Sequence, residues 1–234
     1  MRLLSRLRLR RMAKPRTIRS PSPRRIRLMG VSADSSQSAS GDAIEFDFCV
    51  AMGRLCDDIT SRVPELSHVA MDDVVVGMTR SRRRGRAGLW AKLTPLRFEG
   101  GARVSLRRGR RFVIEPLVVD GRERLYILTF CLPRFLELTY REKLVTVFHE
   151  LYHVGPKFDG DHRRFSGRYH IHSSRADWFD AESERLCELY LATSPVPQAC
   201  RFLEHRADTL LSRHRAITGV TIPVPKLLPL EDAA

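Results

Sequence analysis

Apolar residues recur every three or four positions in several stretches of the chain, which is the spacing of one face of an α-helix. The pattern predicts four helices: residues 42–62, a segment between Thr139 and Gly155-Pro156, residues 176–192 and residues 198–217. The first has a D-x-x-E start at Asp42 and ends before Pro64. The last stretch, residues 219–230, is interrupted by prolines and should run extended along the surface of the body.

Shorter apolar runs typical of strands occupy the region between the first two helices. We expect strands at residues 73–80, 87–93, 112–119 and 124–130. The first two flank an Arg-rich stretch, residues 81–86, that we interpret as the tip of a hairpin. The last two flank Asp120-Gly121, a strong hairpin signal. The sequence therefore predicts an α+β fold with a twisted, mainly antiparallel sheet placed before the second helix.

The second helix has the clearest local signals in the chain. Thr139 and Glu142 form a T-x-x-E capping box at its start. Its apolar stripe consists of Leu144, Val147, Phe148 and Leu151. One face of this helix should therefore pack on a core, and the opposite face should line a cleft.

That helix also carries the candidate chemistry, the HExxH pattern of residues 149–153. Residues four apart on a helix lie on one face with Cβ atoms about 5–6 Å apart, so His149 and His153 can hold one zinc ion. Glu150 lies beside the open coordination position, where it can take a proton from a water molecule activated by the metal.

A catalytic zinc ion keeps three protein ligands and one water, so a third ligand must join His149 and His153. We rank the candidates in the order His172, Glu182, His162 and His170. The metzincin pattern is excluded, because Asp159 stands where its last histidine would be and no methionine follows the motif.

Charge and composition divide the chain into two parts. The formal net charge is +14, but residues 1–29 carry eleven Lys or Arg and no acid, so most of the excess belongs to this segment. We expect residues 1–41 to be a disordered, basic and then Ser-rich arm, and residues 42–234 to be a single domain. The arm is interpreted first as an upstream extension of the reading frame, and otherwise as a transit-like or weakly nucleic-acid-binding segment.

Other compositional features narrow the class of protein. The five cysteines are odd in number and form no CxxC pair, which favours a reducing compartment, here the cytoplasm, over a disulfide framework. No apolar run approaches the length of a membrane helix, so we expect no membrane contact. The Arg clusters at residues 82–86 and 107–111 are interpreted as solvated strand ends rather than phosphate contacts.

The run LPRFLEL…EKLVTVFHELYHVGPKFDGDHRRFSGRYHIHS resembles a metallopeptidase family of bacteria and phages, distantly similar to the SprT-like zinc peptidases. The resemblance covers roughly residues 44–225. It implies a zincin-like fold in which His149, His153 and His172 bind zinc and Glu150 is the base. SprT-like proteins often carry a C-terminal zinc ribbon. This chain lacks the cysteines for one, so their DNA-linked roles are not carried over.

The leading hypothesis is a zinc-dependent metallopeptidase that acts on a peptide or protein substrate, with Zn²⁺ as its cofactor. An extended substrate could pair with the edge of the sheet. The alternative is a non-hydrolytic, zinc-stabilised module that binds nucleic acid or protein. A closed structural site needs a fourth protein ligand and no base, so the presence of Glu150 favours the enzyme.

Overall fold

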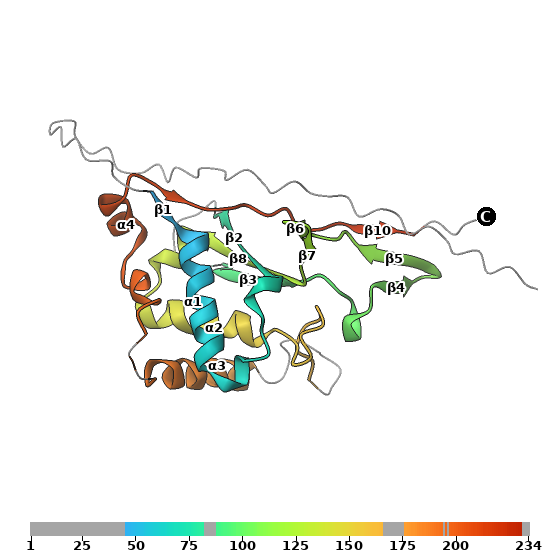
Figure 1. Ribbon diagram of the computed structural model, residues 1–234, viewed down its shortest axis with the longest axis horizontal. Coiled ribbons are helices and arrows are strands. Elements are labelled where there is room, and N and C mark those ends of the chain that lie inside the picture. The colour runs from blue at the N-terminus through green and yellow to red at the C-terminus, as the bar shows by residue number, and fades with distance from the viewer. Residues whose placement is uncertain (1–44, 82–87, 166–175, 194, 196, 231–234) are drawn as a thin grey trace, which may run out of the picture.

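The computed structural model describes residues 45–81, 88–165, 176–193, 195 and 197–230. Its centre is a three-stranded sheet in the order β2-β8-β3, formed by Val74–Arg80, Tyr126–Leu132 and Ala91–Pro95. Helices cover one face of this sheet, and the C-terminal chain runs along the other (Figure 1). The fold is α+β, as the sequence predicts.

Strand β8 holds the central position, which corrects the expected hairpin. Six of its seven residues are buried. β2 pairs with β8 in parallel and β3 pairs with it in antiparallel orientation, so β8 lies between the two strands that we expected to be neighbours. A strand that is apolar on both faces is most stable where both faces and both edges are covered. The central sheet is therefore mixed rather than mainly antiparallel, and residues 82–86, the expected hairpin tip, lie outside the described part of the chain.

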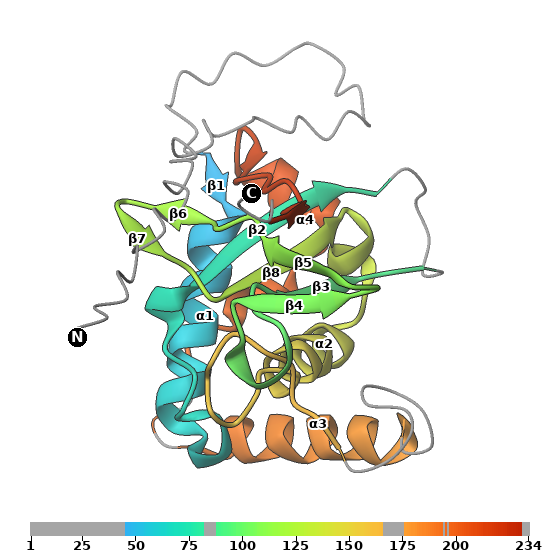
Figure 2. The ribbon, with the colours of Figure 1, turned by 90° about the vertical axis from the view of Figure 1, so that its right-hand side faces the viewer.

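The described helices are α1, α2, α3 and α4, at Phe48–Arg62, Tyr140–Tyr152, Ala176–Leu191 and Ala207–Arg213. Short 3₁₀ segments lie at Pro64–Leu66, Met71–Asp73, Glu99–Gly101, Arg134–Glu137 and Arg201–Glu204. α1 and α2 pack on the sheet, and α3 packs on α2 (Figures 1 and 2). The centre of the core is thus the layer between β8 and the pair α1 and α2.

Helix α1 begins later than the sequence suggests. Asp47 caps it, because its side chain accepts a hydrogen bond of 2.9 Å from the backbone N–H of Val50. The two residues before the helix form β1, Phe46–Asp47, which pairs in parallel with β9, Ile217–Thr218. Asp42, the expected start, lies outside the described residues.

The expected helix over residues 198–217 is wrong. The chain forms the 3₁₀ segment Arg201–Glu204, breaks, and continues as α4 and β9. The ammonium group of Lys143 on α2 donates to the carbonyl oxygens of Leu203 at 2.9 Å and His205 at 2.7 Å. In a continuous helix those two carbonyl oxygens would accept from N–H groups four residues further on, whereas here they accept from the buried lysine.

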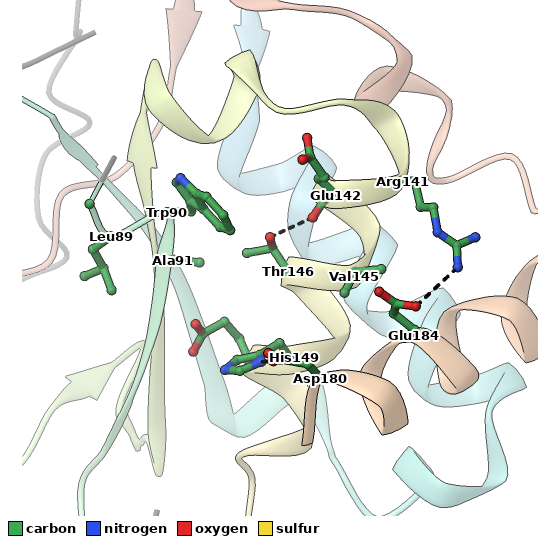
Figure 3. A pocket seen from close by; sticks show the side chains of 12 residues that line it. Leu89, Trp90, Ala91, Arg141, Glu142, Val145, Thr146, His149, Asp180 and Glu184 are labelled. Atoms are coloured by element: carbon green, nitrogen blue, oxygen red, sulfur yellow. Dashed lines mark hydrogen bonds and ion pairs between the residues drawn. The ribbon is translucent and has the colours of Figure 1, made fainter. Parts of the chain in front are cut away.

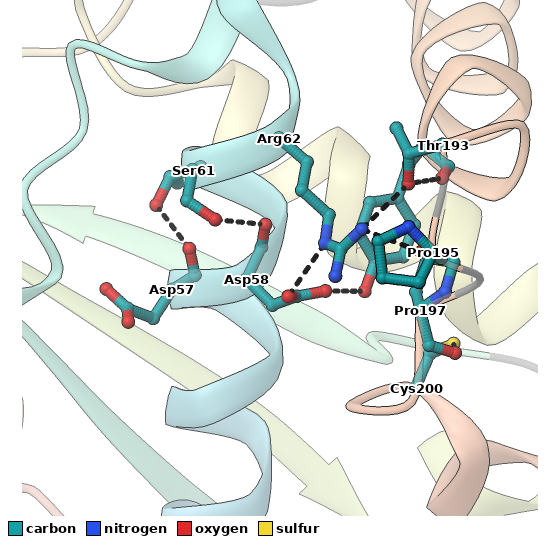
Figure 4. A network of polar contacts seen from close by, with 10 residues as sticks. Asp57, Asp58, Ser61, Arg62, Thr193, Pro195, Pro197 and Cys200 are labelled. Carbon is teal, nitrogen blue, oxygen red and sulfur yellow. Dashed lines mark hydrogen bonds and ion pairs between the residues drawn. The ribbon is translucent and has the colours of Figure 1, made fainter.

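A polar network joins the ends of α1 and α3 (Figure 4). Asp58 accepts hydrogen bonds from Arg62 at 2.8 Å and from the Tyr190 hydroxyl at 2.6 Å. Arg62 also donates to the Thr193 hydroxyl at 3.3 Å and to the carbonyl oxygen of Pro195 at 2.8 Å. The network fixes α3 relative to the helices that pack on the sheet.

Two smaller antiparallel sheets complete the fold. One contains β4, β5 and β10, at Val104–Arg107, Arg110–Ile114 and Leu227–Pro229. The other joins β6 and β7, at Val118–Val119 and Arg122–Glu123. Asp120 and Gly121 have φ of 52° and 76° in the turn between β6 and β7, which confirms the turn expected there. The hairpin is shorter than predicted, because β5 pairs with β4 and β10, and β8 pairs with β2 and β3. The C-terminal segment is extended, as predicted.

Two further features concern the cysteines and the described helices. All five cysteines are buried and free, which confirms that they form no disulfide framework. None of the described helices combines the length and apolarity needed to cross a membrane.

Candidate metal centre

Helix α2 forms as its sequence predicts. Thr139 accepts from the backbone N–H of Glu142, and the Glu142 carboxylate accepts from the backbone N–H of Thr139. The stripe residues Leu144, Val147, Phe148 and Leu151 are fully buried. The helix ends at Tyr152, and His153 is its C-cap with φ −66° and ψ −18°, so it still continues the helical path. His149 and His153 therefore remain one turn apart on the same side of α2.

The two imidazoles converge on one point. The Nε2 atoms of His149 and His153 are 3.2 Å apart. Two nitrogen ligands of a tetrahedral zinc ion, each at 2.0–2.1 Å, are separated by about 3.3 Å. The pair therefore fits two adjacent corners of a zinc coordination shell without a change of side-chain conformation.

Helix α3 holds both imidazoles from the other side. Phe179 stacks on the His153 ring, with a centroid distance of 4.5 Å, and contacts the His149 ring edge-on at 4.7 Å. The Asp180 carboxylate lies 3.2 Å from Nδ1 of His149. An Nδ1–H that donates to this carboxylate leaves the lone pair on Nε2, which is the tautomer that a metal ligand requires.

Glu150 lies between the histidines in sequence, and its carboxylate reaches the edge of the central sheet. It accepts a hydrogen bond of 2.6 Å from the backbone N–H of Leu93 on β3. Burial raises the pKa of the Glu150 carboxyl to about 7, and the bond from Leu93 acts in the opposite direction. A carboxyl group with its pKa near neutrality can both accept and return a proton.

The chain that follows α2 folds back beside the site. The backbone N–H of Arg163 donates to the carbonyl oxygen of His153 at 2.7 Å, and Val154 and His162 form an isolated β-bridge. The Tyr126 hydroxyl from β8 donates to the carbonyl oxygen of Asp161 and accepts from the N–H of Gly160. The segment from residue 154 to residue 165 is thus a compact loop anchored to the central strand.

A cavity of about 450 Å³ opens next to these groups (Figure 3). Residues 88–91 ahead of and within β3 line one side, α2 lines the floor, and Asp180 and Glu184 of α3 line the other side. His149 and Glu150 belong to its wall. The predicted cleft on the face of α2 opposite the apolar stripe is therefore present beside these two residues, whereas His153 is buried.

The third ligand has no assigned place among the described residues. His172 and His170 lie outside them. Within the described residues no three His, Cys, Asp or Glu side chains come together closely enough to hold a metal ion, so neither Glu182 nor His162 completes a triad there. The Glu182 carboxylate pairs with Arg185 at 2.7 Å, and the His162 ring centre is 5.8 Å from that of His153.

Sequence reasoning missed three residues that contact the HExxH residues and one that lines the cavity beside them. The apolar pattern predicts a helix face for Phe179 but no contact with the histidines, and it indicates no role for Asp180, Trp90 or Leu93. Sequence offers little signal for the last, because it contributes a backbone N–H. Asp180 follows Phe179 on the helix predicted to approach the motif, so a carboxylate beside a buried aromatic residue was the available clue.

Two histidines one turn apart on one helix, with a buried glutamate directly after the first, form the arrangement of metal-dependent hydrolases in which the histidines bind the metal and the glutamate is the base. The fold and the site together therefore define an α+β protein with a candidate metallohydrolase centre. The chain belongs to the family described as "Putative phage metallopeptidase", which it matches over residues 49–177, more than half of its length. None of the curated proteins and none of the solved structures compared matches it.

Proposed function

We propose that the protein is a zinc-dependent peptidase of zincin-like fold, in which His149 and His153 hold the metal and Glu150 is the general base. The observation that carries the proposal is the 3.2 Å separation of the two Nε2 atoms, which fits a zinc ion. Membership of a metallopeptidase family supports a peptide as the substrate.

When bound, zinc would polarise the scissile carbonyl group and make a water molecule more acidic. Glu150 would accept the proton of that water and deliver it to the leaving amine. The N–H of Leu93 holds the carboxylate in place, because it donates to one carboxylate oxygen and leaves the other available. Asp180 would keep His149 in the tautomer that presents Nε2.

The third ligand that we propose is His172. Its support is the position of α3, which brings Phe179 against both imidazoles and begins at Ala176, four residues after His172. His172 therefore lies close in sequence to the helix that contacts both imidazoles. Glu182 has weaker support, because its carboxylate is already bound by Arg185.

Strand β3 is the proposed binding edge for the substrate backbone. Among the described strands it pairs only with β8. The carbonyl oxygen of Trp90 accepts from the N–H of Cys131, so the backbone groups of Ala91 and Leu93 point away from β8 under the alternation of an antiparallel ladder. The bond from Leu93 to Glu150 agrees with this alternation. An extended peptide could pair with Ala91 and place its scissile bond at the metal.

The deciding experiment uses Glu150→Gln and His153→Ala in the full chain. Glu150→Gln should retain zinc, because both histidines remain, while cleavage of an unfolded protein substrate falls at least about 10²-fold. His153→Ala should lose both zinc and cleavage. Zinc content is measured by atomic emission and cleavage by release of labelled peptides.

Three outcomes would overturn the proposal. Stoichiometric zinc in His153→Ala would place the metal elsewhere. Equal cleavage by Glu150→Gln and the unmodified protein would remove Glu150 from the reaction. Zinc binding with no cleavage of any unfolded substrate would instead favour a non-hydrolytic zinc-stabilised module.

The five free, buried thiols support the cytoplasm as the proposed location.

A further inference from the structure

The β4–β5 hairpin carries a dense group of arginines. It belongs to the small sheet with β10, at the right-hand end of the molecule in Figure 1 and away from the helices. Five arginines lie within residues 103–111, and all are exposed: Arg103, Arg107, Arg108, Arg110 and Arg111. No acidic residue interrupts this stretch. The hairpin is thus a concentrated positive surface, which we call the arginine hairpin.

The tip of the arginine hairpin keeps its charge at a local energetic cost. Arg107 and Arg110 are directly opposite each other across the ladder, and like charges in such a pair are destabilising. Between them, Arg108 has φ of 50° and Gly109 has φ of 74°. Turns of this kind favour Asn, Asp or Gly at the first position, and arginine gains nothing from that backbone conformation. Two separate features of the tip therefore disfavour arginine, yet arginine occupies all three positions.

The charges at the tip are not neutralised within the described structure. Arg103, at the base, pairs with Glu123 at 3.0 Å. By contrast, no carboxylate in the described ranges forms an ion pair with Arg107, Arg108 or Arg110. The guanidinium carbon of Arg107 lies 5.7 Å from the centre of the Phe98 ring. Three guanidinium groups at one turn are therefore available to an external anion.

We propose that Arg107, Arg108 and Arg110 bind the phosphate backbone of nucleic acid. A planar guanidinium group can donate two parallel hydrogen bonds to one phosphate, and a two-stranded ribbon is narrow enough to approach a duplex groove. The rest of the sequence agrees with a polyanionic partner, because residues 1–29 carry eleven basic residues and residues 82–86 carry four arginines. The interpretation of residues 107–111 as merely solvated strand ends is replaced by this one. The proposal is independent of the peptidase function.

The test compares two triple variants of the full chain that lose the same charge. The tip variant combines Arg107→Gln, Arg108→Asn and Arg110→Gln. Asparagine is chosen at position 108 because it tolerates positive φ, so this variant should fold at least as stably as the unmodified protein. The control variant combines Arg54→Gln, Arg201→Gln and Arg215→Gln, three exposed arginines on other elements. Circular dichroism and thermal unfolding confirm that both variants are folded.

Binding to a labelled, mixed-sequence DNA duplex is measured by fluorescence anisotropy over a range of salt concentrations. Each phosphate contact contributes about 0.9 to the slope of log K against log salt, so the tip variant should have a slope smaller by roughly 2 to 3. Its affinity at moderate salt should fall at least about tenfold, and that of the control much less, because only local contacts differ.

Equal losses in the two variants would overturn the proposal, since they would reflect net charge alone. No loss in the tip variant would overturn it as well. A parallel titration with poly-glutamate separates the classes of partner. If the tip variant loses affinity for poly-glutamate as strongly as for DNA, the surface is a general acceptor of acidic chains, and the assignment to nucleic acid is wrong.

Discussion

At the scale of single residues, the candidate centre depends on two side chains from a different helix. His149 and His153 come from α2, but α3 supplies the ring that packs on both of them and the carboxylate beside His149. Phe179 is buried, whereas the Asp180 side chain is 66% exposed. Phe179 limits ring rotation by packing, and Asp180 acts through a hydrogen bond to one nitrogen atom.

The role of Asp180 leads to a prediction about metal affinity. Asp180→Ala should weaken zinc binding by about 10–100-fold, because His149 loses the acceptor that fixes its tautomer and orientation. Asp180→Asn should lose less, since its side-chain oxygen can still accept from Nδ1–H. Zinc affinity is measured by competition with a chromogenic chelator.

Glu184 provides the control for that prediction. It lies one turn further along α3, lines the same cavity and pairs with Arg141 rather than with a histidine. Glu184→Gln removes the same charge near the site and should leave zinc affinity nearly unchanged. If Asp180→Ala and Glu184→Gln have the same effect, Asp180 contributes only to the general field of the cavity.

At the scale of elements, the loop after α2 packs against the β3–β4 connection, and each of these segments contains a glycine with positive φ. Gly160 has φ of 89°, and a Cβ atom there would lie 2.5 Å from Cγ of Arg97. Arg97 is buried and pairs with Glu123 at 2.9 Å, so it has little freedom to move away. Gly100, in the β3–β4 connection, has φ of 64° but open space around it.

These two glycines separate backbone strain from crowding. Gly100→Ala should cost about 1 kcal/mol, the price of a left-handed conformation for a residue with a Cβ atom. Gly160→Ala should cost about 3 kcal/mol, because the contact with Arg97 adds to a similar strain. Urea unfolding followed by circular dichroism gives both values. Equal costs would show that Arg97 shifts without penalty.

At the scale of the whole molecule, the buried thiols should make the folded protein less stable at alkaline pH. Burial raises the pKa of Cys49 to about 11, and those of Cys56 and Cys187 to about 12. The folded protein therefore keeps protons that the unfolded chain releases above about pH 8.5. Stability from these groups is complete below that pH and is lost as pH rises toward the folded values.

Unfolding under reducing conditions should show this loss. Above about pH 9, each thiol should lower the free energy of unfolding by about 1.4 kcal/mol per pH unit. Burial lowers the pKa of Lys143 to about 8, so this lysine should raise the free energy of unfolding up to about pH 10.5 and offset part of the loss. Cys56→Ala should make the decrease of the free energy of unfolding with pH less steep, by the equivalent of one proton. This change in slope is expected whatever the substitution does to the stability itself. The free energy of unfolding in urea, measured across this pH range, checks both statements. An unchanged slope in Cys56→Ala would show that this thiol does not titrate differently in the two states.

The amino-acid sequence alone determined the local framework of this protein. The capping box at Thr139, the apolar stripe of α2 and the HExxH residues act over distances of three or four positions, so a helix with two histidines on one side follows from local geometry. The end of α1 before Pro64 and the turn at Asp120-Gly121 are equally local. These features form because their energetics hardly depend on the rest of the chain.

Only the tertiary structure decided which elements meet. Leu93 donates to Glu150 across 57 positions of sequence, and Lys143 donates to the carbonyl oxygen of Leu203 across 60. The apolar run of β8 is a local feature, but the pairing of β2 and β3 with its two edges depends on distant segments, which no local pattern encodes. Asp180 reaches His149 only because α3 is fixed against α1 and α2. The residues of the candidate centre are therefore determined by the local sequence of α2, while the groups that surround them result from the packing of distant segments.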